Sequence, residues 1–434
     1  MVTREPRNKR AITSVTFTRQ RQRISSSAQS FSVVYTLECY SVNVLIRGFK
    51  YRFYPTPEQK TTLARTFGSS RYVYNWALNL RTKAWYENQE RVTYAETSAA
   101  LTQLKKQPET AWLNDVSCVP TQQALRQLQS AFVNFWEKRN RYPSFKKKGG
   151  NQSAEFTRSA FDWNGNVLSL AKIGILNIRW SRSFTAMPST VTVSRTASAR
   201  YYVVFRVDEE LQAFPKAFSA IGIDLGLTVF ATTSNGSKFH SSRPLKRQMA
   251  QLKRYQKALS RKQKGSKNRN KAKVKVAKIH QKISDTRNDF LHKLTTKLVR
   301  ENQTIVTEDL NVRNMMTNHQ FAGSIGDSGW GEFVRQLNYK CDWYGRDYVK
   351  IDRWYPSSKR CSGCGNAVAS MSLDIRSWAC NFCGALHDRD INAAVNILAA
   401  GQAVIACGDG VRPPRSQERG GSRPRSRNQS VKTA

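Results

Sequence analysis

The sequence is short of acidic residues and has no long apolar run. Asp and Glu number 30 against 71 Lys and Arg, which leaves a formal net charge of +41. A charge of this size repels itself unless a polyanion neutralises it, so it favours nucleic acid as a partner. No apolar run reaches the roughly 18–20 residues of a membrane span, and the stretch from Phe31 to Ile46 is too polar for a secretory signal. We therefore expect a cytoplasmic protein.

The composition nevertheless predicts a folded chain. Apolar residues make up 39% of the sequence and aromatic residues 11%, including ten Trp. This is more than a merely disordered basic chain carries, and 434 residues suffice for two or three domains. Residues 1–45 are rich in Ser, Thr and Arg, and are expected to be a disordered or spurious N-terminal extension. Residues 403–434 are expected to be a disordered basic tail.

A β domain interrupted by a helical domain is predicted first. Residues 46–53 alternate aromatic with basic side chains, as a half-buried strand does. Thr56, Pro57 and Gln59 then predict a capped helix start. Helical patterning continues to about residue 139, with loops expected near Gly68 and Pro108. Five residues form one apolar stripe at helical spacing: Leu125, Leu128, Phe132, Phe135 and Trp136.

Short alternating runs between residues 154 and 207 predict further strands of the β domain. From residue 220 the pattern changes to a separate α/β unit. Its expected strands are 221–226, 305–310 and 348–351, with a hairpin over 227–239. Its expected helices are 289–299, 332–344 and 390–400. The basic stretch 251–282 is expected to form two helices around a basic loop, and 322–330 a mobile loop like a lid.

Four of the eight cysteines have the spacing of a zinc site. They form two C-x-x-C knuckles separated by fifteen residues: Cys361, Cys364, Cys380 and Cys383. Gly365 and Gly384 follow the knuckles and allow the tight turns that such ligands need. Four thiolates close a tetrahedral coordination sphere, so the Zn²⁺ is expected to be structural. His387 lies outside the knuckle spacing and is expected to be a hydrogen-bonding neighbour. The remaining cysteines are expected to be ordinary thiols: Cys39, Cys118, Cys341 and Cys407.

Three acids stand out because acids are scarce. Asp224 lies inside an apolar strand, Glu308 at the end of another, and Asp390 at the start of a helix after the knuckles. Buried carboxylates are tolerated when they bind a cation or pair with a base. Two strand-borne acids and one helix-borne acid are what an RNase H-type nuclease uses to hold two Mg²⁺ ions. Asp309 and Asp388 are alternative assignments, although strand alternation allows only one of Glu308 and Asp309 to face the site.

Combined motifs then resemble a known family, from about residue 46 to about 412. They are Arg52-Phe53-Tyr54-Pro55, Tyr74-Asn75-Trp76-Ala77-Leu78, Arg141-Tyr142-Pro143, Gly222-Ile223-Asp224-Leu225-Gly226, Thr307-Glu308-Asp309-Leu310, Tyr355-Pro356-Ser357-Ser358-Lys359, the two knuckles and His387-Asp388-Arg389-Asp390-Ile391-Asn392-Ala393-Ala394. The sequence is similar to the TnpB proteins encoded by insertion sequences, which are relatives of the type V CRISPR effector nucleases.

The resemblance implies a multidomain α/β fold. An oligonucleotide-binding-like β wedge domain would span 46–56 and 151–212, with a helical recognition domain (57–150) inserted in it. An RNase H-like (RuvC) nuclease domain would span 213–356 and 385–402, with the zinc ribbon (357–384) inserted. The resemblance implies that Asp224, Glu308 and Asp390 are the catalytic Mg²⁺ ligands, and it favours Asp390 over Asp388.

The implied activity is RNA-guided cleavage of double-stranded DNA beside a short target-adjacent motif. The guide RNA would come from the transposon end. The protein would be prokaryotic and nucleoid-associated, and it would act with a separately encoded transposase. The alternatives are a DNA-binding transposase and a non-enzymatic regulator of transposition. Candidate nucleic-acid contacts are Arg52, Tyr54, Arg71, Asn75, Lys146, Lys147, Lys262, Lys264, Lys267 and Lys271, which would give affinity through phosphates.

Overall fold

The computed structural model describes residues 43–150, 152–372 and 374–407. The expectations for residues 1–42 and 408–434, and for Cys39, lie outside the described residues. The disordered tail expected from residue 403 is wrong for residues 403–406, which continue the last described helix. Among the described helices, none combines the length and the apolar character needed to cross a membrane.

The first part of the described chain contains an antiparallel sheet with the strand order β2-β7-β8-β1-β6. Strand β1 pairs with β8 from Asn43 opposite Leu211 to Phe53 opposite Tyr201. It therefore begins three residues before the predicted position 46, because the partner strand is long enough to continue the ladder. The strands are β1 (Asn43–Phe53), β2 (Gln152–Thr157), β6 (Ile178–Arg179), β7 (Thr190–Arg195) and β8 (Tyr201–Leu211).

Alternation explains which face of this sheet is buried. Phe49, Tyr51 and Phe53 of β1 are all at most 4% exposed, as the alternating pattern predicts. They join a core that includes Phe205 and Trp163. A separate three-stranded sheet borders that core: β3 (Phe161–Trp163), β4 (Leu168–Leu170) and β5 (Gly174–Ile175).

Three helices lie between β1 and β2 in the sequence: α1 (Pro57–Asn88), α2 (Tyr94–Leu104) and α3 (Cys118–Trp136), with a 3₁₀ helix at Pro108–Asp115. The capping box of Thr56 and Gln59 at the start of α1 is confirmed. The loop expected near Gly68 is wrong, because α1 continues through that residue. A single Gly costs a helix only about 1 kcal/mol, and the flanking Phe67 and Val73 are buried.

The second part of the described chain contains a mixed sheet with the order β11-β10-β9-β12-β13. Strands β9, β12 and β13 run parallel, while β10 and β11 are antiparallel to their neighbours. The strands are β9 (Ala220–Asp224), β10 (Ala231–Thr233), β11 (Lys238–Phe239), β12 (Thr304–Glu308) and β13 (Asp347–Ile351).

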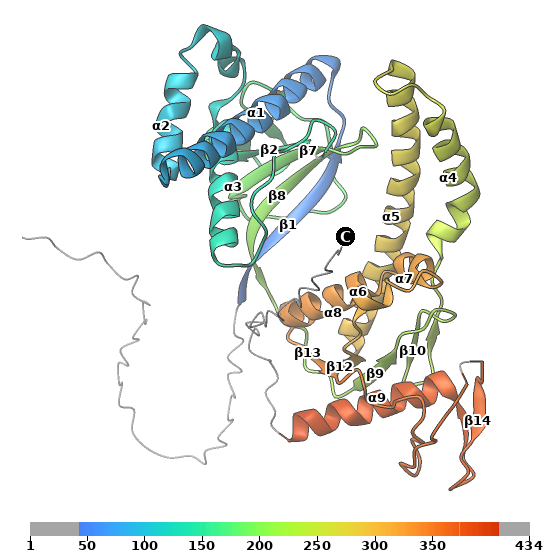
Figure 1. The fold of residues 1–434 in the computed structure, drawn as a ribbon. Helices are drawn as coiled ribbons and strands as arrows, with labels where there is room; N and C mark the ends of the chain where they lie inside the picture. The colour runs from blue at the N-terminus through green and yellow to red at the C-terminus, as the bar shows by residue number, and fades with distance from the viewer. Residues whose placement is uncertain (1–42, 151, 373, 408–434) are drawn as a thin grey trace, which may run out of the picture. The chain divides into compact units, whose positions relative to one another are not determined.

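Helices cover both faces of this sheet (Figure 1). One face packs on α5 and α8 through Ile223 and Ile305. The other face packs on α9 through Val306 and Ile397. The helices are α4 (Pro244–Ser260), α5 (Lys267–Glu301), α6 (Val312–Met315), α7 (Ala322–Ser328), α8 (Trp330–Tyr344) and α9 (Arg389–Ala406).

The basic stretch forms two helices, α4 and α5, joined by residues 261–266, as expected. The separate helix expected at 289–299 is wrong, because α5 runs without interruption from Lys267 to Glu301. Its two halves look different in sequence because the first is exposed and basic. The second packs through Leu291, Leu294 and Leu298 on the sheet.

Candidate active site and metal centre

Asp224 is the last residue of β9. The alternation that turns Ile221 and Ile223 toward α5 and α8 turns Gly222 and Asp224 toward α9. Burial, together with the negative charges of Glu308 and Asp390, raises the pKa of Asp224 to about 7. The sheet therefore carries a carboxyl group that resists ionisation unless a cation approaches it.

Glu308 is the last residue of β12 and lies on the same face of the sheet. Its Oε1 accepts a hydrogen bond from Oγ of Ser357 at 2.6 Å. Burial raises the pKa of Glu308, and the Ser357 hydrogen bond partly opposes this. Asp309 instead pairs with Lys350 at 3.3 Å and Arg353 at 2.9 Å. Of the two neighbouring acids, Glu308 is thus the one that faces Asp224.

Asp388 and Asp390 have different partners at the start of α9. Asp388 is the N-cap, and its Oδ1 accepts hydrogen bonds from the backbone N–H groups of Asp390 and Ile391. Its other oxygen pairs with Nζ of Lys238 at 2.6 Å. Asp390 lies in the first turn, as expected, with its carboxylate 3.5 Å from Arg376.

The three acids line one cavity of about 900 Å³. Four cationic side chains line the same cavity: Arg353, Lys359, Arg376 and Arg389. The lining thus carries both acids and cations, so an anionic phosphate can approach without meeting a uniformly negative surface.

The backbones of β9 and α9, which carry Asp224 and Asp390, approach each other closely. A Cβ at Gly222 would lie 2.2 Å from the carbonyl oxygen of Ala394 and 2.7 Å from the amide nitrogen of Leu398. Strand β9 and helix α9 are therefore in contact through backbone atoms. A similar contact occurs at Gly401 in α9, where a Cβ would lie 2.4 Å from Val306 on β12.

The four knuckle cysteines come together. Cys361, Cys364, Cys380 and Cys383 have sulfur atoms within 4.8 Å of one another, and in the described residues no other group of acids, His or Cys meets this criterion. The Sγ–Sγ distances are 3.6 Å for Cys361–Cys383 and for Cys364–Cys380. Tetrahedral Zn²⁺ with Zn–S bonds of about 2.3 Å places sulfurs about 3.8 Å apart, so the cluster fits this ion.

The turns of both knuckles have the expected form. Gly365 and Gly384 have φ angles of 80° and 74°, which favour glycine. His387 lies on the hairpin formed by β14 (Ser377–Ala379) and β15 (Leu386–Asp388). Its Nε2 is 3.0 Å from Sγ of Cys361, so it is the hydrogen-bonding neighbour that the sequence predicts.

Two asparagines of α9 tie the zinc-ribbon-like segment to the acid site. Asn392 accepts from the amide of Ser362 and donates to the carbonyl of Arg360. Asn396 donates to the carbonyls of Ser357 and Arg360. Both side chains are at most 4% exposed. Sequence reasoning missed them, although buried Asn on an Ala-rich helix is a recognisable signal.

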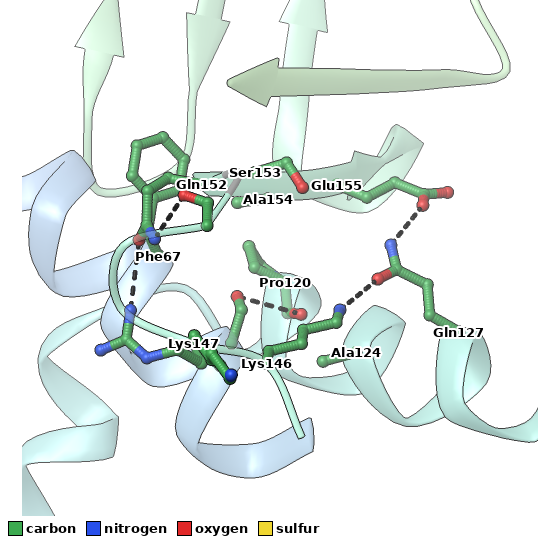
Figure 2. Close-up of a pocket in the computed structure, with 13 residues that line it drawn as sticks. Phe67, Pro120, Ala124, Gln127, Lys146, Lys147, Gln152, Ser153, Ala154 and Glu155 are labelled. Atoms are coloured by element: carbon green, nitrogen blue, oxygen red, sulfur yellow. Dashed lines mark hydrogen bonds between the residues drawn. The ribbon is translucent and has the colours of Figure 1, made fainter. Parts of the chain in front are cut away.

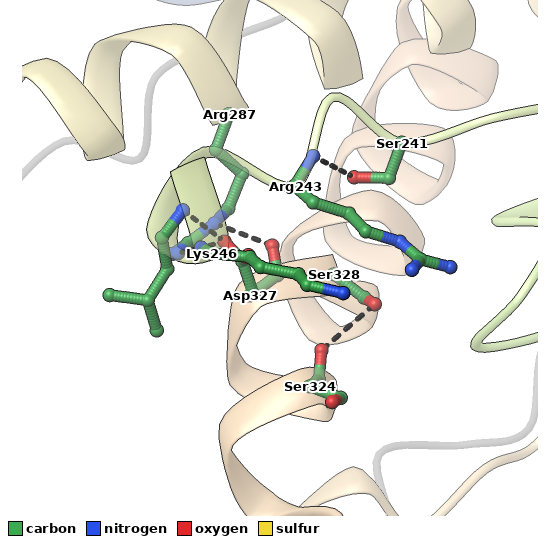
Figure 3. Close-up of polar contacts among 8 residues, drawn as sticks. Ser241, Arg243, Lys246, Arg287, Ser324, Asp327 and Ser328 are labelled. Atoms are coloured by element: carbon green, nitrogen blue, oxygen red, sulfur yellow. Dashed lines mark hydrogen bonds and ion pairs between the residues drawn. The ribbon is translucent and has the colours of Figure 1, made fainter. Parts of the chain in front are cut away.

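The mobile loop expected at 322–330 is wrong. Residues 322–328 form helix α7, and Figure 3 shows how Asp327 anchors it. The Asp327 carboxylate accepts from the amides of Leu245 and Lys246 at the start of α4. Arg287 of α5 donates to both the carboxylate and the carbonyl of Asp327. The polar, glycine-containing sequence resembles a loop, but these long-range partners stabilise a helix.

The candidate nucleic-acid contacts are in different environments. Lys262 and Lys264 lie in the turn between α4 and α5, Lys267 and Lys271 lie at the start of α5, and all four are exposed. Arg52 lies over the ring of Tyr54, with the guanidinium carbon 4.9 Å from the ring centroid. None of these four lysines lines the cavity of the three acids.

Arg71, Lys146 and Lys147 line a separate cavity of about 310 Å³ between α1, α3 and β2 (Figure 2). Nζ of Lys146 donates to Gln127 at 3.1 Å and lies 4.0 Å from the ring centroid of Tyr74. Asn75 donates to the carbonyl of Lys146 and accepts from its amide. Because its whole amide group is used in this way, Asn75 holds the basic loop in place.

The chain is similar to proteins of known families. Residues 202–319 match a family model described as "Probable transposase", and residues 330–397 match one described as "Cas12f1-like, TNB domain". Residues 45–90 match one described as "Helix-turn-helix domain". In the structure, that last segment contains strand β1 and the single uninterrupted helix α1.

Full-length relatives are also found. A Streptomyces pristinaespiralis protein named "Putative RNA-guided DNA endonuclease" is 53% identical over 379 residues, which cover 86% of this chain and 94% of the relative. InsQ of Escherichia coli K12, which has the same description, is 33% identical over 85% of this chain and 96% of the relative. A solved Cas12f1–sgRNA–target DNA complex has a chain with a similar fold. Its TM-score is 0.52 and its identity 12%, over 82% of this chain and 98% of the other.

Proposed function

Because the chain belongs to the TnpB family of transposon-encoded proteins, we propose that it is a transposon-associated, RNA-guided DNA endonuclease. The observation that carries this proposal is the convergence of Asp224, Glu308 and Asp390 on one cavity from β9, β12 and α9. The strand order β11-β10-β9-β12-β13 supports an RNase H-like (RuvC) nuclease domain around these acids.

The acid site has the chemistry of a Mg²⁺ site. Oxygen ligands suit Mg²⁺, and the raised pKa of Asp224 reflects first its burial and then the nearby negative charges of Glu308 and Asp390, both of which a bound cation would offset. The carboxylates of Asp224, Glu308 and Asp390 are the groups that would hold such ions. When bound, such ions would stabilise the attacking and leaving oxygens of phosphodiester hydrolysis.

The residues of this chain supply the remaining requirements. Ser357 fixes the orientation of Glu308, and the cap by Asp388 fixes the first turn of α9, which carries Asp390. Arg353, Lys359, Arg376 and Arg389 would attract the phosphate backbone. The four cysteines would hold a structural Zn²⁺, since four thiolates leave no open position for substrate.

The partners follow from the family and from the charge. The excess of Lys and Arg suits a guide RNA from the transposon end together with a double-stranded DNA target beside a short motif. The exposed lysines of the α4–α5 turn and the cavity of Figure 2 are the proposed phosphate contacts. Excision and joining of transposon ends would belong to a separately encoded transposase.

The decisive experiment purifies the protein from cells that carry its native locus and sequences the RNA that copurifies. The complex is then incubated with Mg²⁺ and a plasmid that matches the guide. Guide-dependent cleavage is expected for the wild type and for the control Asp309→Asn, and its loss for Asp224→Asn. Absence of a discrete transposon-end RNA would contradict the guide. Joining of transposon ends by the purified protein would favour the transposase alternative.

Asp224→Asn also separates catalysis from folding. A carboxyl group whose pKa is raised in the folded state costs stability when it ionises. The stability of the metal-free protein should therefore fall as the pH rises from about 4 to about 7. The Asn variant lacks the charge. It is therefore expected to unfold at a higher temperature than the metal-free wild type at pH 8, while it cleaves no DNA.

A further inference from the structure

A second cavity, distant in sequence from the three acids, lies in the helical insertion. It has a volume of about 330 Å³ and is formed by α1, α3 and the two loops that follow these helices. Its lining is mostly aromatic: Trp85, Phe132, Phe135, Trp136 and Tyr142, with Arg81, Glu90, Arg91 and Val92. We propose that this cavity, hereafter the aromatic pocket, binds one unpaired nucleobase of a single strand.

The aromatic side chains of the pocket are more exposed than core residues. Trp85 is 42% exposed, Trp136 49% and Tyr142 42%. The sequence places Trp136 in the apolar stripe of α3. Phe132 is the last buried residue of that helix, and Trp136 lies one turn beyond it. Large flat rings held half in water can stack on a flat ligand.

These rings are also held in defined orientations. Tyr142 packs edge-to-face on Phe132 and Phe135, with ring centroids 5.6 Å and 5.2 Å apart. The Tyr142 hydroxyl and Oγ1 of Thr82 are 2.8 Å apart in a hydrogen bond. Trp136 lies 5.6 Å from Phe132. Because these contacts preorganise the rings, a ligand would lose little free energy in ordering them.

Arg81 gives the pocket a polar group for the edge of a base. The residue is 7% exposed, and its guanidinium carbon lies 4.3 Å from the ring centroid of Phe132 and 6.0 Å from that of Trp136. Its Nη1 donates to Gln129 at 2.9 Å. Within the described residues, no acceptor for its Nε or Nη2 is recorded. Although the residue is largely buried, these two groups are not among the fully enclosed unpartnered atoms of the described residues. They are therefore open to a ligand that carries acceptors, as the edges of nucleobases do.

The surroundings favour a nucleic-acid strand over a protein side chain. Residues 138–148 contain six Lys or Arg and no acid, and Arg91 at the rim lies 5.8 Å from the ring centroid of Trp85. A strand that follows this basic segment by its phosphates would bring its bases to the rings. Single-strand binding sites combine a basic path with aromatic side chains in this manner.

The test compares a strand that carries one base with a strand that carries none. Both are about 12 residues long, within the usual range of single-strand site sizes. One has a single central guanine among abasic residues, and the other is abasic throughout. Each is made with ribose and with deoxyribose. Affinities are measured for the full-length protein by fluorescence anisotropy at raised salt, which weakens phosphate contacts. The quantity of interest is the affinity ratio between the one-base and the baseless strand.

The wild type is expected to bind the one-base strand about 5- to 150-fold more tightly, the range of one base stacked on an aromatic ring. Trp136→Ala should reduce this ratio to about 1, and Trp136→Phe should restore part of it. Tyr86→Ala is the matched control, because Tyr86 is on the same helix as Trp85, is 74% exposed and does not line the pocket. It should leave the ratio unchanged.

Comparison of the ribose and deoxyribose probes identifies whether the bound base belongs to RNA or to DNA. Either outcome supports base binding in the aromatic pocket. A ratio seen only with ribose assigns the base to RNA, and one seen only with deoxyribose assigns it to DNA. A wild-type ratio near 1, or an unchanged ratio in Trp136→Ala, overturns the proposal. If Trp136→Ala instead changes self-association in sedimentation while the wild-type ratio is 1, the pocket is a protein contact. Asp224→Asn should keep the wild-type ratio, so this test is independent of cleavage.

Discussion

The contact between β9 and α9 can be tested with a single methyl group. In Gly222→Ala the new Cβ would meet the Ala394 carbonyl oxygen at 2.2 Å, whereas ordinary contacts begin near 3.4 Å. Helix α9 would therefore have to withdraw by about 1.2 Å. Overpacking of this kind costs typically 1–3 kcal/mol of stability. A misplacement of about 1 Å in an active site can cost about 100-fold in rate, and α9 carries Asp390.

We therefore expect Gly222→Ala to lower guide-directed DNA cleavage about 100-fold in single-turnover assays, with a measurable loss in urea midpoint. The control is Gly331→Ala, the same substitution in α8, where a Cβ would meet no atom within 4 Å. That variant should cleave normally and gain up to about 1 kcal/mol of stability from the better helix former. If both variants cleave at the wild-type rate, backbone contact between β9 and α9 does not position the third acid.

Three further predictions concern other parts of the structure. Cys364→Ser should lower zinc content and expose the ribbon-like segment to protease, because the ion loses one of four thiolates. Ser357→Ala should slow cleavage about 10- to 150-fold, since hydrogen bonds to charged groups contribute about 1.5–3 kcal/mol. Its pH–rate profile should shift upward, because the serine lowers the pKa of Glu308. Burial lowers the pKa of Lys340 to about 8. The unfolded chain thus binds more protons above that pH, and stability should rise from pH 8 to about 10.4, by up to about 3 kcal/mol. Lys340→Met should lack this rise in urea titrations.

Each of these has a control or a contradicting result. Cys118→Ser removes an exposed free thiol and should keep its zinc. Ser358→Ala should keep the pH profile, since the Glu308 contact belongs to Ser357. Parallel stability curves for wild type and Lys340→Met between pH 8 and 10.4 would contradict the inferred burial of the ammonium group.

Local spacing explains why much of the site could be predicted from the sequence. The knuckle cysteines are close in sequence within each pair, so their meeting requires only two tight turns. Asp224 and Glu308 end short apolar strands, and strand alternation alone places them on the α9 face. Alternation allows only one of Glu308 and Asp309 to face the site. The ion pairs of Asp309 with Lys350 and Arg353 show that Asp309 is the one that faces away.

The errors arise where distant residues decide the local structure. Residues 322–328 become helical because Asp327 finds Arg287 and the start of α4, far away in sequence. Gly68 does not end α1, because packing on both sides of it outweighs its intrinsic cost. Trp136 has core spacing, yet no element covers it in the described part of the chain, and helical periodicity carries no information on where a neighbouring element ends.

The place of Asp390 on the last described helix has a consequence for protein synthesis. By the time the ribosome reaches α9, the β domain, its helical insertion and the basic α4–α5 turn have all been made. On the proposed function, a nascent chain could engage nucleic acid before it could cut it.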